Sequence, residues 1–318
     1  MPTEMLEKVF SHLAPKDLKT VMLVCKTWNN AGGRPSLWSW VKITSSSQLR
    51  LKRLQGAREL TIKENPKGSW HKLLRAIHKH PSIKKINFGA FWLTTETELL
   101  AKVFAKIEEI EVNSKDGTTY VLDTILQRPN NLKKLVVWDF HHVDPVHLAT
   151  ALNKIEVLEV RLSSEQANLL FKTMKDDGTS IRSLSLEFFD QLSELEPKYL
   201  FAAFEKFEAV EFWDCEDAPR DVMTTFFKTS TNLKKLLLTC VHNFSHVDHT
   251  LLRRMATQLE ELYLGGGCDE GDCDMTNQIG TIIDAIASDE VATLKKLTLH
   301  YIDLSFRFRE CLQVCSSH

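Results

Sequence analysis

A short phrase of the form apolar-x-x-apolar-x-apolar returns ten times along the chain at nearly constant spacing. Consecutive copies start 23 to 26 residues apart, except the last, which follows its predecessor by 35 residues. Alternation inside each phrase is typical of a strand with one buried face. No single repeat of this length can bury its own apolar face, so the pattern predicts a stack of repeats. The copies begin at Ala57, Ile83, Ile107, Leu132, Ile155, Ile181, Phe207, Leu233, Leu259 and Leu294.

Helix-like stretches lie between these phrases, for example at 99–106, 120–127, 146–153, 167–174, 199–204, 221–227 and 279–287. One strand and one helix per repeat of this length is the leucine-rich-repeat pattern, and nearly every copy of the phrase resembles that family. The predicted fold class is therefore α/β. Residues 45–318 are expected to form a curved solenoid with about ten parallel strands on the concave side and helices outside. Val41–Ile43 indicates one shorter, earlier strand.

Side chains alternate along a strand, so positions three and five after each anchor should point inward, and positions two, four and six should face the concave surface. Most of the concave positions are polar. The large apolar exceptions are Val136, Trp138, Trp213, Leu237 and Tyr263. Aromatic residues contribute much of the energy at protein interfaces, about 2 kcal/mol or more at a hot spot. We therefore expect a substrate-binding patch flanked by Trp138 and Trp213, with polar surroundings supplied by Glu159, Arg161, Glu187 and Glu211. The alternative is that the tail or an acidic loop folds back and covers these residues.

The first forty residues carry more large apolar side chains than so short a segment can bury. Helical three- and four-residue steps separate Met5, Leu6, Val9, Phe10 and Leu13, and Pro15 ends that helix. A second short helix is predicted over 18–25, and several tryptophans follow it. An apolar stripe that a segment cannot hide is a candidate interface. The alternative is a helical cap that closes the repeat array.

Residues 1–44 resemble the F-box. The resemblance rests on Pro2-x-Glu4-x-Leu6-x-x-Val9-Phe10-x-x-Leu13, Asp17-Leu18, Leu23-Val24-Cys25-Lys26-x-Trp28 and Leu37-Trp38. Met1 stands where the family motif has a leucine before its proline. The resemblance implies docking to the Skp-family adaptor of a cullin–RING ubiquitin ligase. The residues it assigns to adaptor contact are Pro2, Leu6, Val9, Phe10, Leu13, Leu18, Val24, Cys25, Trp28, Leu37 and Trp38, some of which must also hold the helices together.

The two resemblances together imply a substrate-recognition subunit of an SCF-type ubiquitin ligase. Its F-box would bind the Skp-family adaptor, and through it a cullin, while its repeats would bind the protein to be ubiquitinated. Such a subunit contributes proximity and orientation and has no catalytic residues of its own. The alternative is a leucine-rich-repeat scaffold without a ligase role.

Composition and motifs argue against other functions. The formal net charge is -2, and no continuous basic stripe forms along the repeats, so nucleic acid is not an expected partner. No apolar run approaches twenty residues, so no membrane span is expected. The chain lacks a phosphate loop, a serine elbow and a dinucleotide fingerprint, so we expect neither an enzyme nor a cofactor. Seven scattered cysteines favour a reducing compartment, the cytoplasm or the nucleus.

Two groups of potential metal ligands are not expected to bind a metal. Cys268 and Cys273 lie in the acidic, glycine-rich stretch 265–274, which is expected to be a flexible loop, and their spacing fits neither a zinc knuckle nor a calcium loop. The residues of the second group are Cys240, His242, His246 and His249. No turn is evident that would bring them together, so they are expected to be surface side chains. The remaining possibility for them is a metal-dependent hydrolase.

Overall fold

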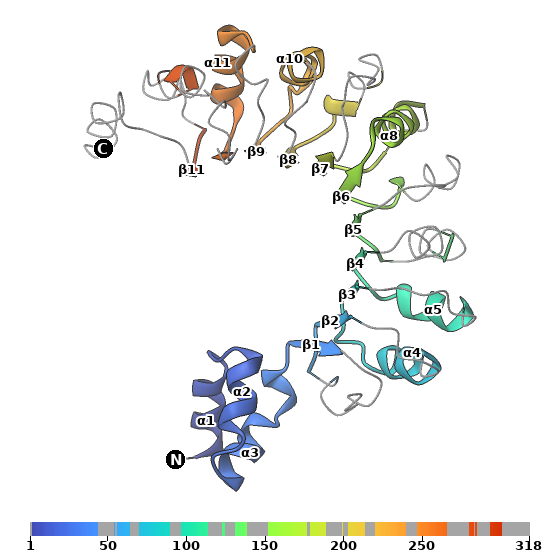
Figure 1. Cartoon of the computed structure of the whole chain (residues 1–318), viewed down its shortest axis with the longest axis vertical. Coiled ribbons are helices and arrows are strands. Elements are labelled where there is room, and N and C mark those ends of the chain that lie inside the picture. Colours follow the sequence, from blue (N-terminus) through green and yellow to red (C-terminus); the bar gives the residue numbers. More distant parts are fainter. Residues whose placement is uncertain are drawn as a thin grey trace. The chain divides into compact units, whose positions relative to one another are not determined.

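The chain forms two compact units, Met1–Asp139 and Phe140–His318, each with its own helices and parallel strands (Figure 1). The structure is a computed structural model. It describes residues 2–43, 54, 56–63, 70–89, 97–113, 123–124, 131–138, 152–176, 179–188, 199, 203–213, 220–239, 247–265, 280–282, 284 and 293–300. Within this part of the chain, no helix is both long and apolar enough to cross a bilayer.

The first unit opens with three short helices, α1 (Thr3–Phe10), α2 (Pro15–Val21) and α3 (Lys26–Gly32), and a 3-10 turn, η1 (Pro35–Leu37). Pro2 precedes α1 and Glu4 lies in its first turn, where a carboxylate suits the positive end of the helix dipole. The second helix begins and ends earlier than predicted, at Pro15 and Val21 instead of residues 18 and 25. The N–H groups of Leu23 and Val24 donate to carbonyls three residues back, at 3.0 and 3.2 Å, and this tighter turn ends α2. Val24 and Cys25 therefore lie in the connection to α3.

Strands and helices then alternate within the first unit. The elements are β1 (Trp40–Ile43), β2 (Glu59–Ile62), α4 (Trp70–Lys79), β3 (Lys85–Phe88), α5 (Thr97–Phe104), β4 (Glu109–Val112) and β5 (Lys134–Val137). Neighbouring strands pair in parallel and in chain order from β1 to β5. Aromatic side chains fill the space between strands and helices, with the Phe88 ring 6.3 Å from Trp70 and 6.2 Å from Phe104 between centroids.

The second unit continues the same alternation. Its elements are β6 (Val157–Leu162), α8 (Ser164–Asp176), β7 (Ser183–Phe188), β8 (Ala209–Trp213), α10 (Arg220–Thr229), β9 (Lys235–Thr239), α11 (His249–Gln258), β10 (Glu261–Gly265) and β11 (Lys296–His300). The strands pair in parallel from β6 to β11. Phe226 lies at the centre of the core, with ring centroids 5.0 Å from both Phe204 and Phe212, edge to face.

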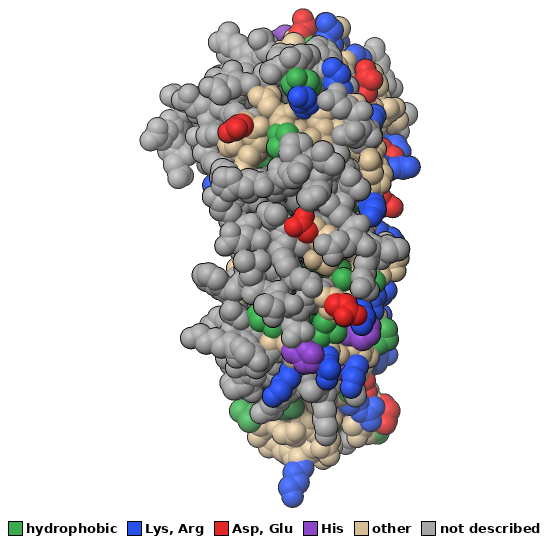
Figure 2. All heavy atoms as spheres, turned by 90° about the vertical axis from the view of Figure 1, so that its right-hand side faces the viewer, with side chains coloured by type: hydrophobic (Ala, Val, Ile, Leu, Met, Phe, Trp, Pro, Cys, Tyr) green, Lys and Arg blue, Asp and Glu red, His purple; other side chains and the backbone are tan. Residues whose placement is uncertain are grey.

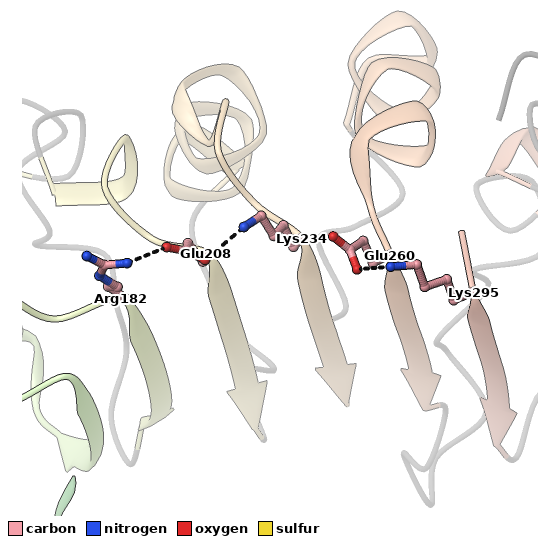
Figure 3. A network of polar contacts seen from close by, with 5 residues as sticks. All are labelled: Arg182, Glu208, Lys234, Glu260 and Lys295. Carbon is pink, nitrogen blue, oxygen red and sulfur yellow. Dashed lines mark hydrogen bonds and ion pairs between the residues drawn. The ribbon is translucent and has the colours of Figure 1, made fainter. Parts of the chain in front are cut away.

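A repeated backbone contact sets the register of these strands. The carbonyl of the residue just before most strands accepts two hydrogen bonds from the next repeat. That of Glu208, for example, accepts from the N–H groups of Lys234 and Lys235 at 2.7 and 3.0 Å. Charged side chains form a row at the same edge of the second unit (Figure 3). Its ion pairs are Arg182–Glu208 at 3.2 Å, Glu208–Lys234 at 3.0 Å and Glu260–Lys295 at 2.6 Å. Side chains at equivalent repeat positions therefore lie in rows across the strands.

The predicted α/β class, with parallel strands in chain order, is confirmed. The early strand expected at Val41–Ile43 is β1, and the helices expected at 99–106, 167–174 and 221–227 correspond to α5, α8 and α10. Burial alternates along the strands as predicted, with positions three and five inside. Residues 266–274 and the tail from 301 onward lie outside the described residues, as do most of the other helices expected from the sequence.

Candidate protein-interaction surfaces

The three leading helices pack around a compact apolar core. Its buried side chains are Leu6, Phe10, Leu18, Ala31, Leu37 and Trp38, with Leu13, Val21, Met22, Trp28 and Val41 packed against them. The Phe10 ring meets Trp28 edge to face, with centroids 5.3 Å apart. The indole N–H of Trp38 donates to the carbonyl of Gly32 at 2.9 Å. Methyl addition at Gly32 would place a carbon 2.5 Å from Cγ of Met22, so this glycine permits close packing of the two segments.

This core corrects part of the predicted adaptor contact. Five of the predicted residues, Leu6, Phe10, Leu18, Leu37 and Trp38, are at most 8% exposed and hold the helices together. Burial removes their side chains from any surface that a partner could reach. Leu13 and Trp28 are half-buried against the same core. Pro2, Val9, Val24 and Cys25 are exposed and stay candidates for contact.

Large apolar side chains remain at the surface of the same segment. On α1, Met5 and Val9 are 58% and 54% exposed, one helical turn apart. In the connection between α2 and α3, Leu23 and Val24 are 84% and 61% exposed, next to exposed Cys25. Several large apolar side chains left exposed within one short segment mark it as an interaction site. We call Pro2, Met5, Val9, Leu23, Val24 and Cys25 the exposed apolar set.

Two members of this set were not among the predicted contacts. Met5 precedes Val9 by four residues, so helical periodicity alone places both on one face of α1. Leu23 lies in a turn, where periodicity gives no signal. Its exposure follows from the end of α2 at Val21, which the sequence pattern did not indicate.

A polar cluster ties α1 to the segment that follows α3. Arg34 Nη1 lies 2.7 Å from Oε2 of Glu7, and Nη2 lies 3.7 Å from Oε1 of Glu4. The hydroxyl of Ser36 donates to the other carboxylate oxygen of Glu7. That hydrogen bond is the main reason why the pKa of Glu7 lies below its ordinary value; Arg34 lowers it further, and partial desolvation opposes both. The ionised carboxylate therefore fixes α1 against residues 34–36.

The strand face of the second unit, on the side away from the helices, is the other candidate surface. Register pairs Glu159 with Ser185, Ser185 with Glu211, Glu211 with Leu237 and Leu237 with Tyr263, so these five form one row across β6–β10. A second row contains Arg161, Glu187 and Trp213. The structure thus places seven of the nine predicted substrate-binding residues, together with Ser185, in two adjacent rows within one unit.

Trp213 is 40% exposed and anchored along one edge. Its indole N–H lies 3.1 Å from the hydroxyl oxygen of Ser185 and 3.4 Å from a carboxylate oxygen of Glu211. These contacts fix the orientation of the ring while two fifths of its surface stays accessible. A preoriented, partly exposed aromatic ring is the kind of side chain that anchors interfaces, because little rotamer entropy is lost on binding.

Lys235 lies among carboxylates on the same face. Its ammonium is 2.9 Å from Oε1 of Glu211. That hydrogen bond raises the pKa of Lys235 above the ordinary value, against partial desolvation, and the charges of Glu211, Glu261 and Glu159 raise it further. Nearby, Nε of Arg161 lies 3.2 Å from Oε1 of Glu187. Lys235 and Arg161 thus both contact carboxylates.

The strand face of the first unit has a different composition. Lys85 lies between Glu59 and Glu109, with nitrogen–oxygen distances of 3.7 and 3.9 Å. Trp138 is 41% exposed, as expected. Val136 is only 7% exposed, so the prediction that it offers apolar surface was wrong. Trp138 and Trp213 belong to different units, and a single patch flanked by both stays a prediction.

Among the described residues, no three histidine, cysteine or acidic side chains are grouped as metal ligands. Cys240, His242, His246, Cys268 and Cys273 lie outside the described residues. His249 begins α11, where its ring hydrogen-bonds to the hydroxyl of Thr281 at 2.5 Å. On the face shown in Figure 2, several described Lys, Arg and His side chains lie together toward the lower end, and the acidic side chains are scattered.

Comparison with known proteins assigns the leading segment. Residues 1–44 match the model of the F-box-like family. Among solved structures, the chain is similar to one in the crystal structure of the Rad7 and Elc1 complex in yeast, with 14% identity and a TM-score of 0.48, over 96% of this chain and 91% of that chain. Values this low transfer neither fold nor function. No curated protein sequence matches the chain.

Proposed function

We propose that this chain, which carries an F-box-like domain at residues 1–44, is a non-catalytic substrate-recognition subunit of an SCF-type ubiquitin ligase. The F-box-like domain would bind a Skp-family adaptor, and through it a cullin. Repeats of the leucine-rich type would hold the protein to be ubiquitinated. The contribution of the chain would be proximity and orientation, since the ubiquitin-charged enzyme is bound elsewhere in the complex.

The single observation that carries this proposal is the exposed apolar set. Had the leading helices served only as a cap on the repeats, their apolar side chains would be covered by the first strands. Trp38 and the partly buried Val41 do link the helical core to β1. Met5, Val9, Leu23 and Val24 nevertheless remain more than half exposed. An apolar surface left open in a segment with an F-box-like sequence supports docking of an adaptor.

The test is co-purification of the full chain with a Skp-family adaptor. We expect Val9→Asp combined with Leu23→Asp to reduce adaptor capture at least tenfold, because two charges would be buried in an apolar interface. Both side chains lie at the surface, so the fold should persist, as circular dichroism would show. Asp at Leu6 and Phe10 would be a poor test, because both belong to the helical core and their loss would unfold it.

Thr20→Asp is the matched control, since it adds the same charge at an exposed polar position of α2. It should leave adaptor capture unchanged. Failure of the unmodified chain to capture any Skp-family adaptor would favour the scaffold without a ligase role. Equal loss with Thr20→Asp would show that charge in general, rather than the exposed apolar set, controls capture.

A further inference from the structure

We propose that the strand face of β6–β10 binds an extended protein segment in which lysine or arginine side chains alternate with apolar ones. This inference rests on the proposed function and names the substrate class that the repeats would recognise. It depends on three features of that face: an excess of carboxylates, a group of three apolar side chains, and small residues beside that group.

The excess of negative charge is local to this face. At positions two, four and six of the five strands, carboxylates occur at Glu159, Glu187, Glu211 and Glu261, whereas cations occur at Arg161 and Lys235. Arg161 contacts Glu187, and Lys235 contacts Glu211. Lys296 of β11 lies opposite Glu261, and the face stays acidic when it is included. Cations on a partner would therefore meet complementary charge.

Apolar contact would come from Trp213, Leu237 and Tyr263. Leu237 and Tyr263 are adjacent in one row, and Trp213 follows Glu211 of the same row by two residues on β8. The Trp213 ring is held at its N–H edge and is 40% exposed, so an apolar or cationic side chain can pack on it.

Some of the residues beside these apolar side chains are small. Ser185 lies beside Glu211, and Thr239 pairs with Gly265 next to Tyr263. A Cβ at Gly265 would lie 3.1 Å from both Cγ2 of Thr239 and Cε1 of Tyr263, so the absence of a side chain there makes room for the tyrosine ring. Leu237 and Tyr263, which are partly exposed, are therefore less crowded on the side of Thr239 and Gly265.

The dimensions favour an extended segment. Neighbouring strands lie about 4.8 Å apart, so a row across five strands spans about 19 Å. An extended chain rises about 3.3 Å per residue, and about six residues would cross the row. Successive side chains of such a segment point in opposite directions. A segment with its apolar residues at every second position could thus direct them to Leu237 and Tyr263. The long side chains of the intervening lysine or arginine residues could bend back to the surrounding carboxylates.

The experiment uses the full chain and two fluorescein-labelled peptides of matched design, (Lys-Phe-Lys-Gly)3 and (Glu-Phe-Glu-Gly)3. Fluorescence anisotropy at moderate ionic strength should show saturable binding of the lysine peptide and at least about tenfold weaker binding of the glutamate peptide. Added salt should weaken the lysine complex, because part of its free energy is electrostatic. Equal binding of both peptides, or no binding of either, would overturn the inference.

Two matched pairs of variants locate the site. Trp213→Ala should weaken the lysine peptide about tenfold or more, whereas Trp138→Ala, which removes an equally exposed indole from the other unit, should change it less than twofold. Glu159→Gln with Glu261→Gln should weaken binding several-fold, whereas Glu111→Gln on β4 should not. Equal losses within either pair would place binding elsewhere and defeat the proposal. Trp213→Phe, which keeps a ring, should retain most of the binding and so separates lost contact from lost fold.

Adaptor capture is measured on the same variants and should be unchanged. If capture is intact but the peptides bind without charge preference, the inference fails and the proposed function stands. If the chain captures no adaptor but still prefers the lysine peptide at Trp213, the ligase role fails and the binding face stands. Elution of the chain as a dimer that excludes the lysine peptide would show that a second copy occupies the face, and would also overturn the inference.

Discussion

The strand faces of the two units share a backbone design but differ in their side chains. In the first unit, position two of successive repeats carries Glu59, Lys85, Glu109 and Lys134, and Lys85 lies between the first and third of these. In the second unit, the same position carries Val157, Ser183 and Ala209 before charge returns at Lys235. On the face of the first unit, side chains of opposite charge therefore lie next to one another and can pair. The face of the second unit has uncharged residues at this position, near the exposed indole of Trp213.

This difference indicates which face is available for a partner. Alternating ion pairs across neighbouring strands satisfy their own charges and present a polar, solvated surface. Val157, Ser183 and Ala209, at position two of the second unit, cannot form such ion pairs. In the adjacent rows of that unit, carboxylates outnumber cations. A partner that supplies cations and apolar side chains gains more on β6–β10 than on β2–β5. The repeat backbone, which is common to both, does not itself select a partner.

The largest expected effect tests whether the two units differ only at the surface. Phe88 and Phe226 are each fully buried and each contact further aromatic rings. Phe88→Ala and Phe226→Ala should each reduce the free energy of unfolding by about 3–5 kcal/mol, because transfer and cavity terms are similar in both cores. Urea denaturation measures both. If the two losses of unfolding free energy differ by more than about 2 kcal/mol, the units differ in the packing of their cores as well as in their strand faces.

A smaller effect is expected from the central lysine of each face. Lys235→Met removes a cation from among Glu211, Glu261 and Glu159, so the lysine peptide should bind up to about fivefold more tightly. Lys85→Met should leave peptide binding unchanged. Both variants should lose at most about 1 kcal/mol of stability, since both side chains are more than a third exposed. Weaker peptide binding by Lys235→Met would show that this lysine contacts the peptide directly. It would also show that the carboxylates of this face do not control the binding of a basic peptide.

The repeat period and the parallel strand order followed from the sequence because each strand must bury alternate residues, and ten copies of one pattern reinforce one another. The sequence did not predict which apolar residues of the leading helices form the core and which are exposed. Leu6 and Val9 both fit the helical apolar stripe, yet Leu6 is buried and Val9 is exposed. Which side of a wide stripe faces the core depends on how α1 packs against α3, and a single helix does not encode that contact. Val136 was predicted to be exposed, but it is buried, for a related reason. Alternation along one strand predicts which way a side chain points, and it does not predict whether another part of the chain covers that side chain.

The edge row of charges, which both units share, gives the smallest expected effect. A hydrogen bond from Lys84 is the main reason for the lowered pKa of Glu108 in the first unit, and one from Lys234 has that role for Glu208 in the second. A carboxyl pKa that is lower in the folded state stabilises the fold above its unfolded value of about 4.3, and that contribution is lost as pH falls through the folded value. Glu108→Gln and Glu208→Gln should therefore each lower stability slightly at pH 7, and each variant should converge on the unmodified chain as pH falls through the lowered folded value. Urea titrations across this range measure the difference. Convergence in only one unit would show that the edge contacts, like the faces, distinguish the two halves of the repeat array.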